Sequence, residues 1–303
     1  MKVVYFGTGS FATPALARLA PHIAMVVTQP DRPSGRGMRL QPTQVKLMAE
    51  GLGLPVLTPE KARAPEFVEQ IKALEADMLV VASYGQILSQ SLLDSTRRGG
   101  INLHGSLLPR YRGAAPIQRC IQAGDEVTGV TLMQMDKGMD TGDMIAVAEC
   151  PIGPDQTYGE LQDRLAALAA DLIVAWAPRI AEGDYPRSVQ DPNRATLAPK
   201  VEKDEAQLHF ARDAREQYNA FRAFNPSPGA FLRTNMGTVK VSEARFSSSQ
   251  GPVGVVLSGG SGCLVAFEGG SLDLLEVQPE GKRRMTGKDF VNGARLRPGT
   301  SLQ

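Results

Sequence analysis

Hydrophobic runs of strand length alternate with helical patterns along the first half of the chain. Three continuous apolar runs are bounded by Gly, Pro or charged residues, as in strands buried on both faces: 2–7, 23–29 and 77–85. Apolar residues recur with helical spacing in three stretches around these runs: 13–20, 42–51 and 64–76. This alternation predicts an α/β fold with a Rossmann-like, mostly parallel sheet and helices on both of its faces.

Two further strand-length runs, 128–135 and 143–152, precede the clearest amphipathic helix, which spans 157–180. Thr157 is followed three residues later by Glu160, which is the spacing of a capping box. We therefore expect this helix to begin at that pair.

The pattern changes after this helix. Residues 182–205 are polar, rich in proline and without periodicity, which predicts a linker. A short helical pattern at 211–223 is followed by short strand-like runs separated by Gly and Ser clusters. The sequence thus predicts a first domain over 1–181 and a smaller C-terminal β-barrel (OB-like) domain over 206–303.

Composition restricts the class of protein. The 303 residues are 42% hydrophobic and 21% charged, as in soluble globular proteins of two domains. The apolar runs are too short for a membrane span, and Met1 leads directly into a strand-like run, so we expect no secretory signal. Cys120, Cys150 and Cys263 are far apart and form no CxxC pair, which favours a reducing cytoplasm and argues against a disulfide framework or a zinc site.

The formal net charge of +1 conceals an asymmetry between the two predicted domains. Residues 206–303 contain 12 Lys and Arg against 8 Asp and Glu, a net charge of +4, whereas 1–205 contain 21 against 24, a net charge of −3. Lys282, Arg283 and Arg284 form a basic cluster in the C-terminal part. Such a run is either a solvated turn or a contact for a polyanion.

The glycines after the first predicted strand fit two interpretations. Gly7, Gly9 and Ala12 match the loose GxGxxA pattern of dinucleotide-binding turns. Asp31, the candidate for the acidic partner of that motif, follows Pro30 and is expected in a loop rather than at a strand end. We therefore favour a tight strand-to-helix turn over a site for NAD.

A long basic insertion follows the second predicted strand. Residues 29–40 are rich in Gly and Pro and include Arg32, Arg36 and Arg39. The segment is either a solvated surface loop or a loop that grips phosphates.

The strongest candidate for chemistry is the pair Asn102 and His104. Side chains alternate between the two faces of an extended chain, so these two residues, which are two positions apart, lie on the same face. An amide donor beside an imidazole is suited to polarising a carbonyl and moving a proton. A buried structural histidine is the alternative. A glycine-rich loop holds three carboxylates, Asp136, Asp140 and Asp143, and one of them reaching His104 would orient its ring. Their spacing is not that of a calcium loop, so no metal is expected.

Two segments together resemble the folate-dependent formyltransferase family: INLHGSLLPRYRGAAPIQ (101–118) and GVTLMQMDKGMDTGDMI (129–145). FGTGSFA after the first strand, TQPDRPSGRG in the basic insertion and RAFNPSPGAF (222–231) are similar to the methionyl-tRNA formyltransferases within that family. The glycinamide ribonucleotide formyltransferases, the alternative, resemble only the N-terminal part. Ser227 departs from the pattern, because many relatives carry an aromatic residue there.

The resemblance implies roles for individual residues. The catalytic trio would be Asn102, His104 and Asp140. The formyl donor, 10-formyltetrahydrofolate, would be bound by two segments: Ser106, Leu107, Leu108 and Pro109, and Ser83, Tyr84, Gly85 and Gln86. Initiator methionyl-tRNA would contact two basic groups: Arg32, Arg36 and Arg39, and Lys282, Arg283 and Arg284. The protein would act as a cytoplasmic monomer without a metal, with catalysis in 1–181 and tRNA binding in 206–303.

The resemblance also implies a direct transfer. The α-amino group of the esterified methionine would attack the formyl carbon, and Asn102 and protonated His104 would stabilise the tetrahedral oxyanion. Asp140 would orient His104 and help to move the proton. Two rival interpretations remain. An NAD-dependent dehydrogenase would need the turn at 7–12 to hold a pyrophosphate, and a non-enzymatic RNA-binding module would leave this trio without a role.

Overall fold

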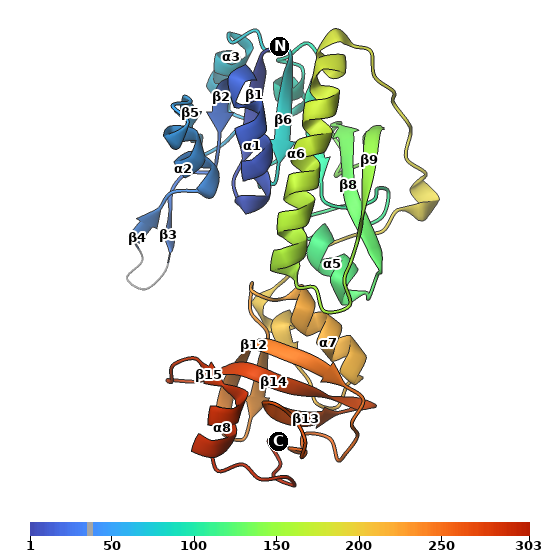
Figure 1. Cartoon of the computed structure of the whole chain (residues 1–303). Helices are drawn as coiled ribbons and strands as arrows, with labels where there is room; N and C mark the ends of the chain where they lie inside the picture. The colour runs from blue at the N-terminus through green and yellow to red at the C-terminus, as the bar shows by residue number, and fades with distance from the viewer. Residues whose placement is uncertain (35–38) are drawn as a thin grey trace. The chain divides into compact units, whose positions relative to one another are not determined.

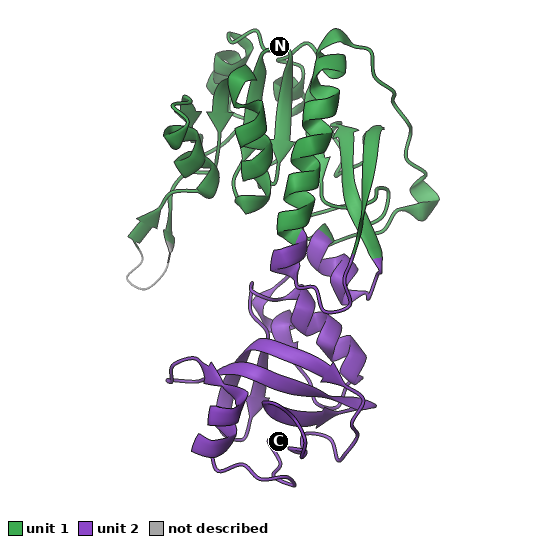
Figure 2. Ribbon diagram, viewed as in Figure 1, with its two compact units in different colours: residues 1–116, 127–151, 162–198 green, residues 117–126, 152–161, 199–303 purple. Residues whose placement is uncertain are grey.

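The computed structural model describes residues 1–34 and 39–303. The chain forms two compact units (Figures 1 and 2). The first unit comprises residues 1–116, 127–151 and 162–198, and the second comprises 117–126, 152–161 and 199–303.

A seven-stranded sheet forms the centre of the first unit, in the order β5-β2-β1-β6-β7-β8-β9. Its strands are β1 Val3–Gly7, β2 Ile23–Val27, β5 Val56–Leu57, β6 Met78–Ala82, β7 Gly100–His104, β8 Val127–Gln134 and β9 Met144–Pro151. Neighbours from β5 to β7 are parallel, and β8 and β9 extend the sheet with antiparallel pairs. The predicted mostly parallel sheet is confirmed.

Helices cover both faces of this sheet (Figure 1). They are α1 Thr13–Leu19, α2 Gln44–Gly51, α3 Pro65–Lys72, α4 Gln90–Leu93 and most of α6 Tyr158–Glu182, whereas α5 Pro116–Gln122 belongs almost wholly to the second unit. Val4 and Phe6 of β1 pack in one core cluster with apolar residues of α3 and α4. Tyr5 points to the opposite face, where its hydroxyl donates to the carbonyl of Ala12 before α1. Because side chains alternate along this buried strand, β1 packs against helices on both faces of the sheet.

The capping box predicted for the long helix is present. The main-chain N–H of Thr157 donates to the Glu160 carboxylate at 2.8 Å, and the Glu160 N–H donates back to the Thr157 hydroxyl at 3.5 Å. These bonds satisfy N–H groups that have no partner within the helix, so the pair defines the start of α6.

The turn after β1 is shaped by close packing. The chain passes from Gly7 into the short helix η1 Ser10–Ala12, and a Cβ atom at Gly7 would lie 2.7 Å from the Cβ of Ala12. Asp31 lies beyond the end of β2 and forms an ion pair of 2.9 Å with Lys46, which raises the pKa of the Lys46 amine. Close packing within the turn thus requires glycine at position 7. The Asp31 carboxylate is already paired with Lys46.

The segment after α6 is hydrogen-bonded to the first unit along 188–198. Ser188 exchanges two main-chain hydrogen bonds with Met144 of β9. Arg112 accepts from the Ala198 N–H and donates to the Thr196 carbonyl. The helix η3 Pro192–Arg194 lies between these anchors. The polar, aperiodic pattern that predicts a linker corresponds to irregular backbone. Its N–H and C=O groups form hydrogen bonds with β9 and with the loop that contains Arg112.

The second unit is built on six strands. They are β10 Gln207–Leu208, β11 Phe231–Thr234, β12 Gly237–Ser247, β13 Cys263–Phe267, β14 Gly270–Pro279 and β15 Met285–Thr286, accompanied by η4 Lys203–Ala206, α7 Ala214–Ala223 and α8 Gly287–Gly293. The main path is β10-β11-β12-β14-β13, and all its pairs are antiparallel except β10 with β11. Glu268, after β13, bonds to the backbone of Phe210, Arg212 and Ala214 beyond β10. These bonds connect the segment that follows β10 with the end of β13, the strands at the two ends of the path.

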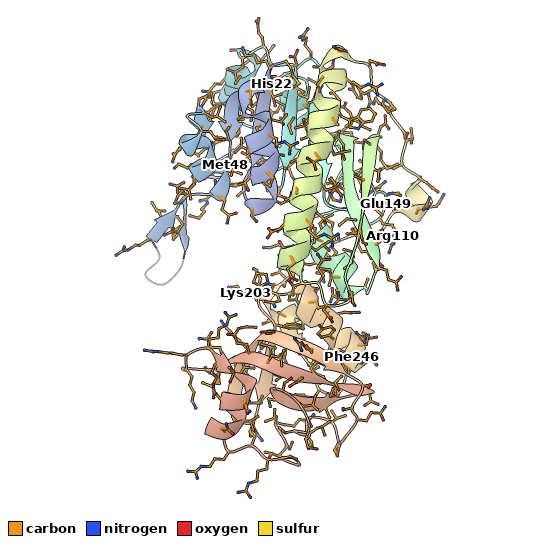
Figure 3. All side chains as sticks on the ribbon, viewed as in Figure 1. His22, Met48, Arg110, Glu149, Lys203 and Phe246 are labelled. Atoms are coloured by element: carbon orange, nitrogen blue, oxygen red, sulfur yellow. The ribbon has the colours of Figure 1, made fainter. Side chains whose placement is uncertain are left out.

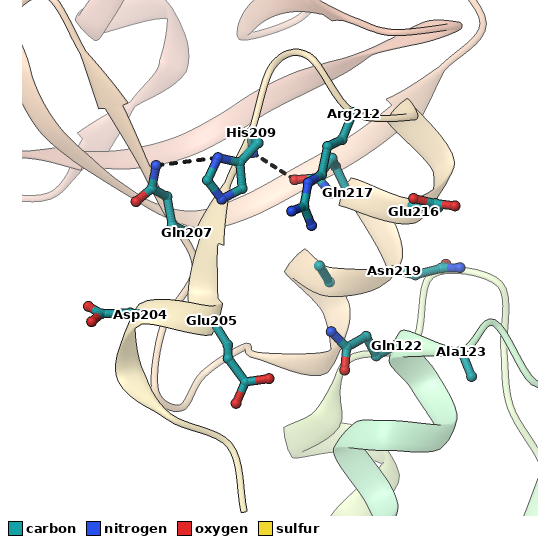
Figure 4. Close-up of a pocket in the computed structure, with 11 residues that line it drawn as sticks. Gln122, Ala123, Asp204, Glu205, Gln207, His209, Arg212, Glu216, Gln217 and Asn219 are labelled. Atoms are coloured by element: carbon teal, nitrogen blue, oxygen red, sulfur yellow. Dashed lines mark hydrogen bonds between the residues drawn. The ribbon is translucent and has the colours of Figure 1, made fainter. Parts of the chain in front are cut away.

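The second unit also contains a polar cavity of about 530 Å³ (Figure 4). His209 lies in its wall, where its main-chain N–H donates to the Gln217 side chain at 2.7 Å. Burial lowers the pKa of the His209 imidazole, and the nearby Arg212 and Arg233 lower it further. The cavity therefore presents amides and carboxylates around a neutral ring at pH 7 (Figure 4).

The two glycines of the turn after β1 give a direct test of the packing argument. We expect Gly7→Ala to reduce the free energy of unfolding by about 1–3 kcal/mol, because the new methyl group overlaps Ala12. Gly9→Ala is the matched control, since no atom lies within 4 Å of its new Cβ. Chemical denaturation of both variants measures the difference, and equal stabilities would contradict the account.

Candidate active site

Asn102 and His104 lie at the carboxyl end of β7, which runs between β6 and β8. The two side chains share a face, as predicted, and both approach Asp140. The Asn102 amide donates to Asp140 Oδ1 at 3.3 Å, and His104 Nδ1 lies 3.6 Å from Asp140 Oδ2. The structure thus brings the predicted trio together.

Asp140 is held by groups from two other parts of the chain. Its Oδ2 accepts the main-chain N–H of Gly113 at 2.8 Å, in addition to facing His104. Its backbone is left-handed, with φ of 53°, a conformation that Asp tolerates better than most residues. The carboxylate is therefore positioned both by the groups that contact it and by the backbone conformation of Asp140.

His104 is nearly buried, with 5% of its surface exposed. Its Nε2 lies 2.9 Å from the carbonyl oxygen of Tyr111. Because a carbonyl oxygen only accepts, Nε2 carries a proton in this arrangement. The ring therefore presents Nδ1 to Asp140, and a proton on Nδ1 would lie between the imidazole and the carboxylate.

Only one of the three loop carboxylates reaches His104. Asp136 accepts from the Gly138 N–H and the Thr141 hydroxyl, which closes the loop on itself. Asp143 forms an ion pair of 3.0 Å with Arg187. Asp140 is thus the loop carboxylate that lies against the ring, and the other two shape the loop.

Backbone strain is concentrated around this cluster. Five described residues other than glycine have positive φ, and three of them, Ser83, Tyr111 and Asp140, lie in the loops at the site or carry a group bonded to it. Such conformations cost on the order of 1–3 kcal/mol each and persist where the surroundings impose them. Their clustering is typical of active sites.

The loop after β7 is folded tightly onto the sheet. The fully buried Ser106 hydroxyl donates to the Arg110 carbonyl at 2.7 Å, and the buried Thr131 hydroxyl links the Ser106 carbonyl to the Leu108 N–H. Leu108 and Pro109 are buried and Leu107 is half-buried. The hydroxyl of Ser106 is thus used within the protein, so Leu107 and the loop backbone are the parts of this segment available to a ligand.

The loop after β6 runs beside the trio, because Val81 of β6 pairs with Asn102 of β7. Ser83 and Gly85 are exposed there. Tyr84 is buried against Phe6, and burial raises its pKa to about 12. Gln86 donates to the Pro59 carbonyl and accepts from the Ala62 N–H, which fixes the loop. Of the four predicted residues, Ser83 and Gly85 face solvent and the other two support them.

Five of the six predicted tRNA contacts lie on or next to paired strands that the structure describes. Arg32 and Arg39 are exposed on β3 Arg32–Ser34 and β4 Arg39–Gln41, and Arg32 pairs with Glu60 at 3.1 Å; Arg36 lies outside the described residues. In the second unit, Lys282, Arg283 and Arg284 follow β14, and all three are exposed. Arg284 pairs with Glu276 at 3.1 Å. Exposed pairs of this kind contribute little energy, so they compete weakly with a phosphate.

Sequence reasoning missed three groups that hold the trio: the carbonyl of Tyr111, the N–H of Gly113 and the side chain of Gln190. Gln190 donates to the carbonyls of Asp140 and Gly142 at 2.8 and 2.7 Å. Two of these groups are backbone atoms, which leave no signature in a sequence. The third is one glutamine in a polar segment, where no pattern distinguishes it.

Within the described parts of the chain, no cluster of His, Cys, Asp or Glu has the arrangement of a metal site, and no helix is long and apolar enough to cross a bilayer.

Two family models match the chain. A formyl transferase model matches residues 1–176, and a model of the C-terminal domain of formyl transferases matches 200–295. A methionyl-tRNA formyltransferase of Geobacter metallireducens is 43% identical and covers 100% of this chain and 98% of the relative. Those of Symbiobacterium thermophilum and Halorhodospira halophila are each 46% identical, covering 99% and 100% of this chain and 94% and 99% of their own lengths.

Solved structures share the fold at lower identity. An N-formyltransferase from Helicobacter canadensis, in complex with folinic acid and dTDP-3-aminofucose, has a TM-score of 0.68 at 17% identity, covering 90% of this chain and 97% of its own. HypX from Aquifex aeolicus, in complex with tetrahydrofolic acid, has a TM-score of 0.66 at 13% identity, covering 96% of this chain and 47% of its own.

The hydrogen bond from His104 to Tyr111 predicts which ring nitrogen holds the proton. In the neutral ring, we expect His104 to be protonated on Nε2 and unprotonated on Nδ1. Long-range proton–nitrogen spectra of the histidine-labelled protein measure this, and His104→Asn identifies the signal among three histidines (His22 is labelled in Figure 3). A proton on Nδ1 with a bare Nε2 would contradict the geometry.

Proposed function

Because the chain belongs to the methionyl-tRNA formyltransferase family, we propose that it transfers the formyl group of 10-formyltetrahydrofolate to the α-amino group of methionine on initiator tRNA. The observation that carries this proposal is the convergence of Asn102, His104 and Asp140 at the carboxyl end of β7. Ligands of open α/β sheets bind at the carboxyl ends of the strands, where such side chains reach them.

The residues beside the trio fit a folate. Ser83 and Gly85 expose backbone at the end of β6, and Leu107 contributes a half-buried apolar side chain from the next loop. Main-chain N–H and C=O groups next to an apolar wall suit a flat heterocycle with several donors and acceptors. The bound folate would supply an activated formyl group.

The trio supports direct transfer of the formyl group. In the described residues, the Asn102 amide makes one hydrogen bond, to Asp140, and its second N–H is available to an oxygen that gains negative charge. Asp140 lies against His104 Nδ1, where a proton from the attacking amine can be held. Cys120, Cys150 and Cys263 are all buried, and burial raises the pKa of the Cys263 thiol to about 12. No cysteine nucleophile is therefore needed or available.

The tRNA contacts are proposed from charge. Residues 206–303 carry a net charge of +4, and Lys282 and Arg283 project there as exposed cations. Arg32, Arg36 and Arg39 would supply further contacts from the basic insertion. We propose that 206–303 bind tRNA by its phosphates while 1–181 perform the reaction, in a cytoplasmic monomer that uses no metal.

The catalytic assignment predicts the effect of removing each side chain. We expect Asn102→Ala, His104→Ala and Asp140→Asn each to reduce the rate of methionyl-tRNA formylation about a hundredfold or more. Asp136→Asn is the matched control, because Asp136 bonds only within its own loop in the described structure, and it should leave the rate nearly unchanged. Steady-state kinetics with circular dichroism measure rate and fold. Near wild-type rates for all three folded variants would refute the assignment.

The electrostatic assignment predicts a dependence on salt. We expect the double change Lys282→Ala and Arg283→Ala to raise KM for methionyl-tRNA and to reduce the salt slope of its affinity by about 1 for each lost phosphate contact. Lys72→Ala, on the exposed side of α3, is the control in the first unit. A salt slope identical to that of the wild type would exclude Lys282 and Arg283 from the tRNA interface.

A further inference from the structure

We infer that Gln190 is a positioning residue that holds both His104 and Asp140 in place, an inference that rests on the proposed function of that trio. The side chain is 4% exposed and belongs to the polar segment after α6. Among the described residues, its side chain hydrogen-bonds to Arg112 and to the main chain of Asp140 and Gly142, and not to the side chains of the trio. Its effect on the reaction would pass through the backbone of two loops.

The first loop carries Asp140. Gln190 Nε2 donates to the carbonyl of Asp140 at 2.8 Å and to that of Gly142 at 2.7 Å. One amide nitrogen thus holds the carbonyls on both sides of Thr141. Because Asp140 has a φ of 53°, its backbone needs such partners to stay in a conformation that few residues adopt. Fixing this backbone fixes the direction of the carboxylate.

The second loop carries Arg112. Gln190 Oε1 accepts from Arg112 Nε at 3.1 Å and from Arg112 Nη2 at 2.8 Å. Arg112 lies between Tyr111, whose carbonyl binds His104 Nε2, and Gly113, whose N–H binds Asp140 Oδ2. Anchoring Arg112 therefore holds the two backbone groups that orient the imidazole and the carboxylate.

All the hydrogen-bonding capacity of the Gln190 amide is used in these contacts. A glutamine side chain offers two N–H donors and two acceptor lone pairs, and here it meets two carbonyls and two guanidinium N–H groups. Glutamate would keep the bond to Arg112 but would face the two carbonyls with an oxygen that cannot donate. Leucine would lose both sets of bonds. Gln190→Glu therefore tests the bonds to the 140–142 loop alone, and Gln190→Leu tests both sets of bonds together.

Gln134 provides a matched control. It is also buried, at 8% exposed, and its amide donates to the carbonyls of Arg98 and Gly100 while accepting from the Tyr185 hydroxyl. These bonds lie at the amino end of β7, whereas the trio lies at the carboxyl end. Gln134→Leu should therefore cost comparable stability without disturbing the site.

The kinetic test compares Gln190→Leu, Gln190→Glu and Gln134→Leu in the transfer reaction. We expect both Gln190 variants to lower kcat about a hundredfold with little change in KM, because catalytic groups displaced by about 1 Å lose this much. Gln134→Leu should keep the wild-type kcat. In an Asp140→Asn background, Gln190→Leu should lower kcat little further, since both changes disrupt the same arrangement of the Asp140 carboxylate. A wild-type kcat in Gln190→Glu, or fully additive losses, would overturn the inference.

A second readout needs no substrate. The Gly113 amide donates to Asp140 Oδ2 at 2.8 Å, so its hydrogen exchange reports whether the carboxylate is in place. We expect this amide to exchange at least about tenfold faster in Gln190→Leu and unchanged in Gln134→Leu. Unchanged exchange in both would overturn the inference. If the wild-type chain fails to formylate methionyl-tRNA, the proposed function falls and the exchange result still decides the role of Gln190.

Discussion

The position of the Asp140 carboxylate is the constraint on which the rest of the site depends. Its two oxygens face an amide from β7, an imidazole from β7 and a main-chain N–H from the loop that follows β7. The sheet supplies the first two groups at a fixed spacing, because Asn102 and His104 are two residues apart on a strand. Asp140 must be brought to them from the loop between β8 and β9, and its left-handed backbone is part of that fit.

The sheet also explains why this loop can reach β7. β8 pairs with β7 in antiparallel register, and His104 lies opposite Thr131. The chain therefore leaves β8 at the amino end of β7 and returns to the site through the loop that contains Asp140. The polar segment after α6 completes the enclosure by bonding to both the 109–115 and the 140–142 loops. A segment that looks like a connector in the sequence thus helps to build the candidate site.

Much of this could be predicted from the sequence where a pattern repeats or a motif is long. Buried strands such as β1 and β6 and the amphipathic α6 have strong periodicity, and two-residue spacing places Asn102 beside His104. The short elements β5, α5 and α8 carry too few residues for a periodic signal. Ser106 shows another limit: its residue type permits a ligand contact, but its hydroxyl is consumed by the Arg110 carbonyl. Contacts made by backbone, such as those of Tyr111 and Gly113, depend on the folded path and not on residue type.

The central claim is that this site moves a formyl group to the amine of an aminoacylated tRNA. The most direct measurement uses 10-formyltetrahydrofolate labelled in the formyl carbon, with methionyl-tRNA and glycinamide ribonucleotide present together. After hydrolysis of the ester bond, the account predicts label on the α-amino group of methionine, formed by the wild-type chain and at least about a hundredfold more slowly by Asp140→Asn. Label found on glycinamide ribonucleotide, or released only as formate, would contradict it.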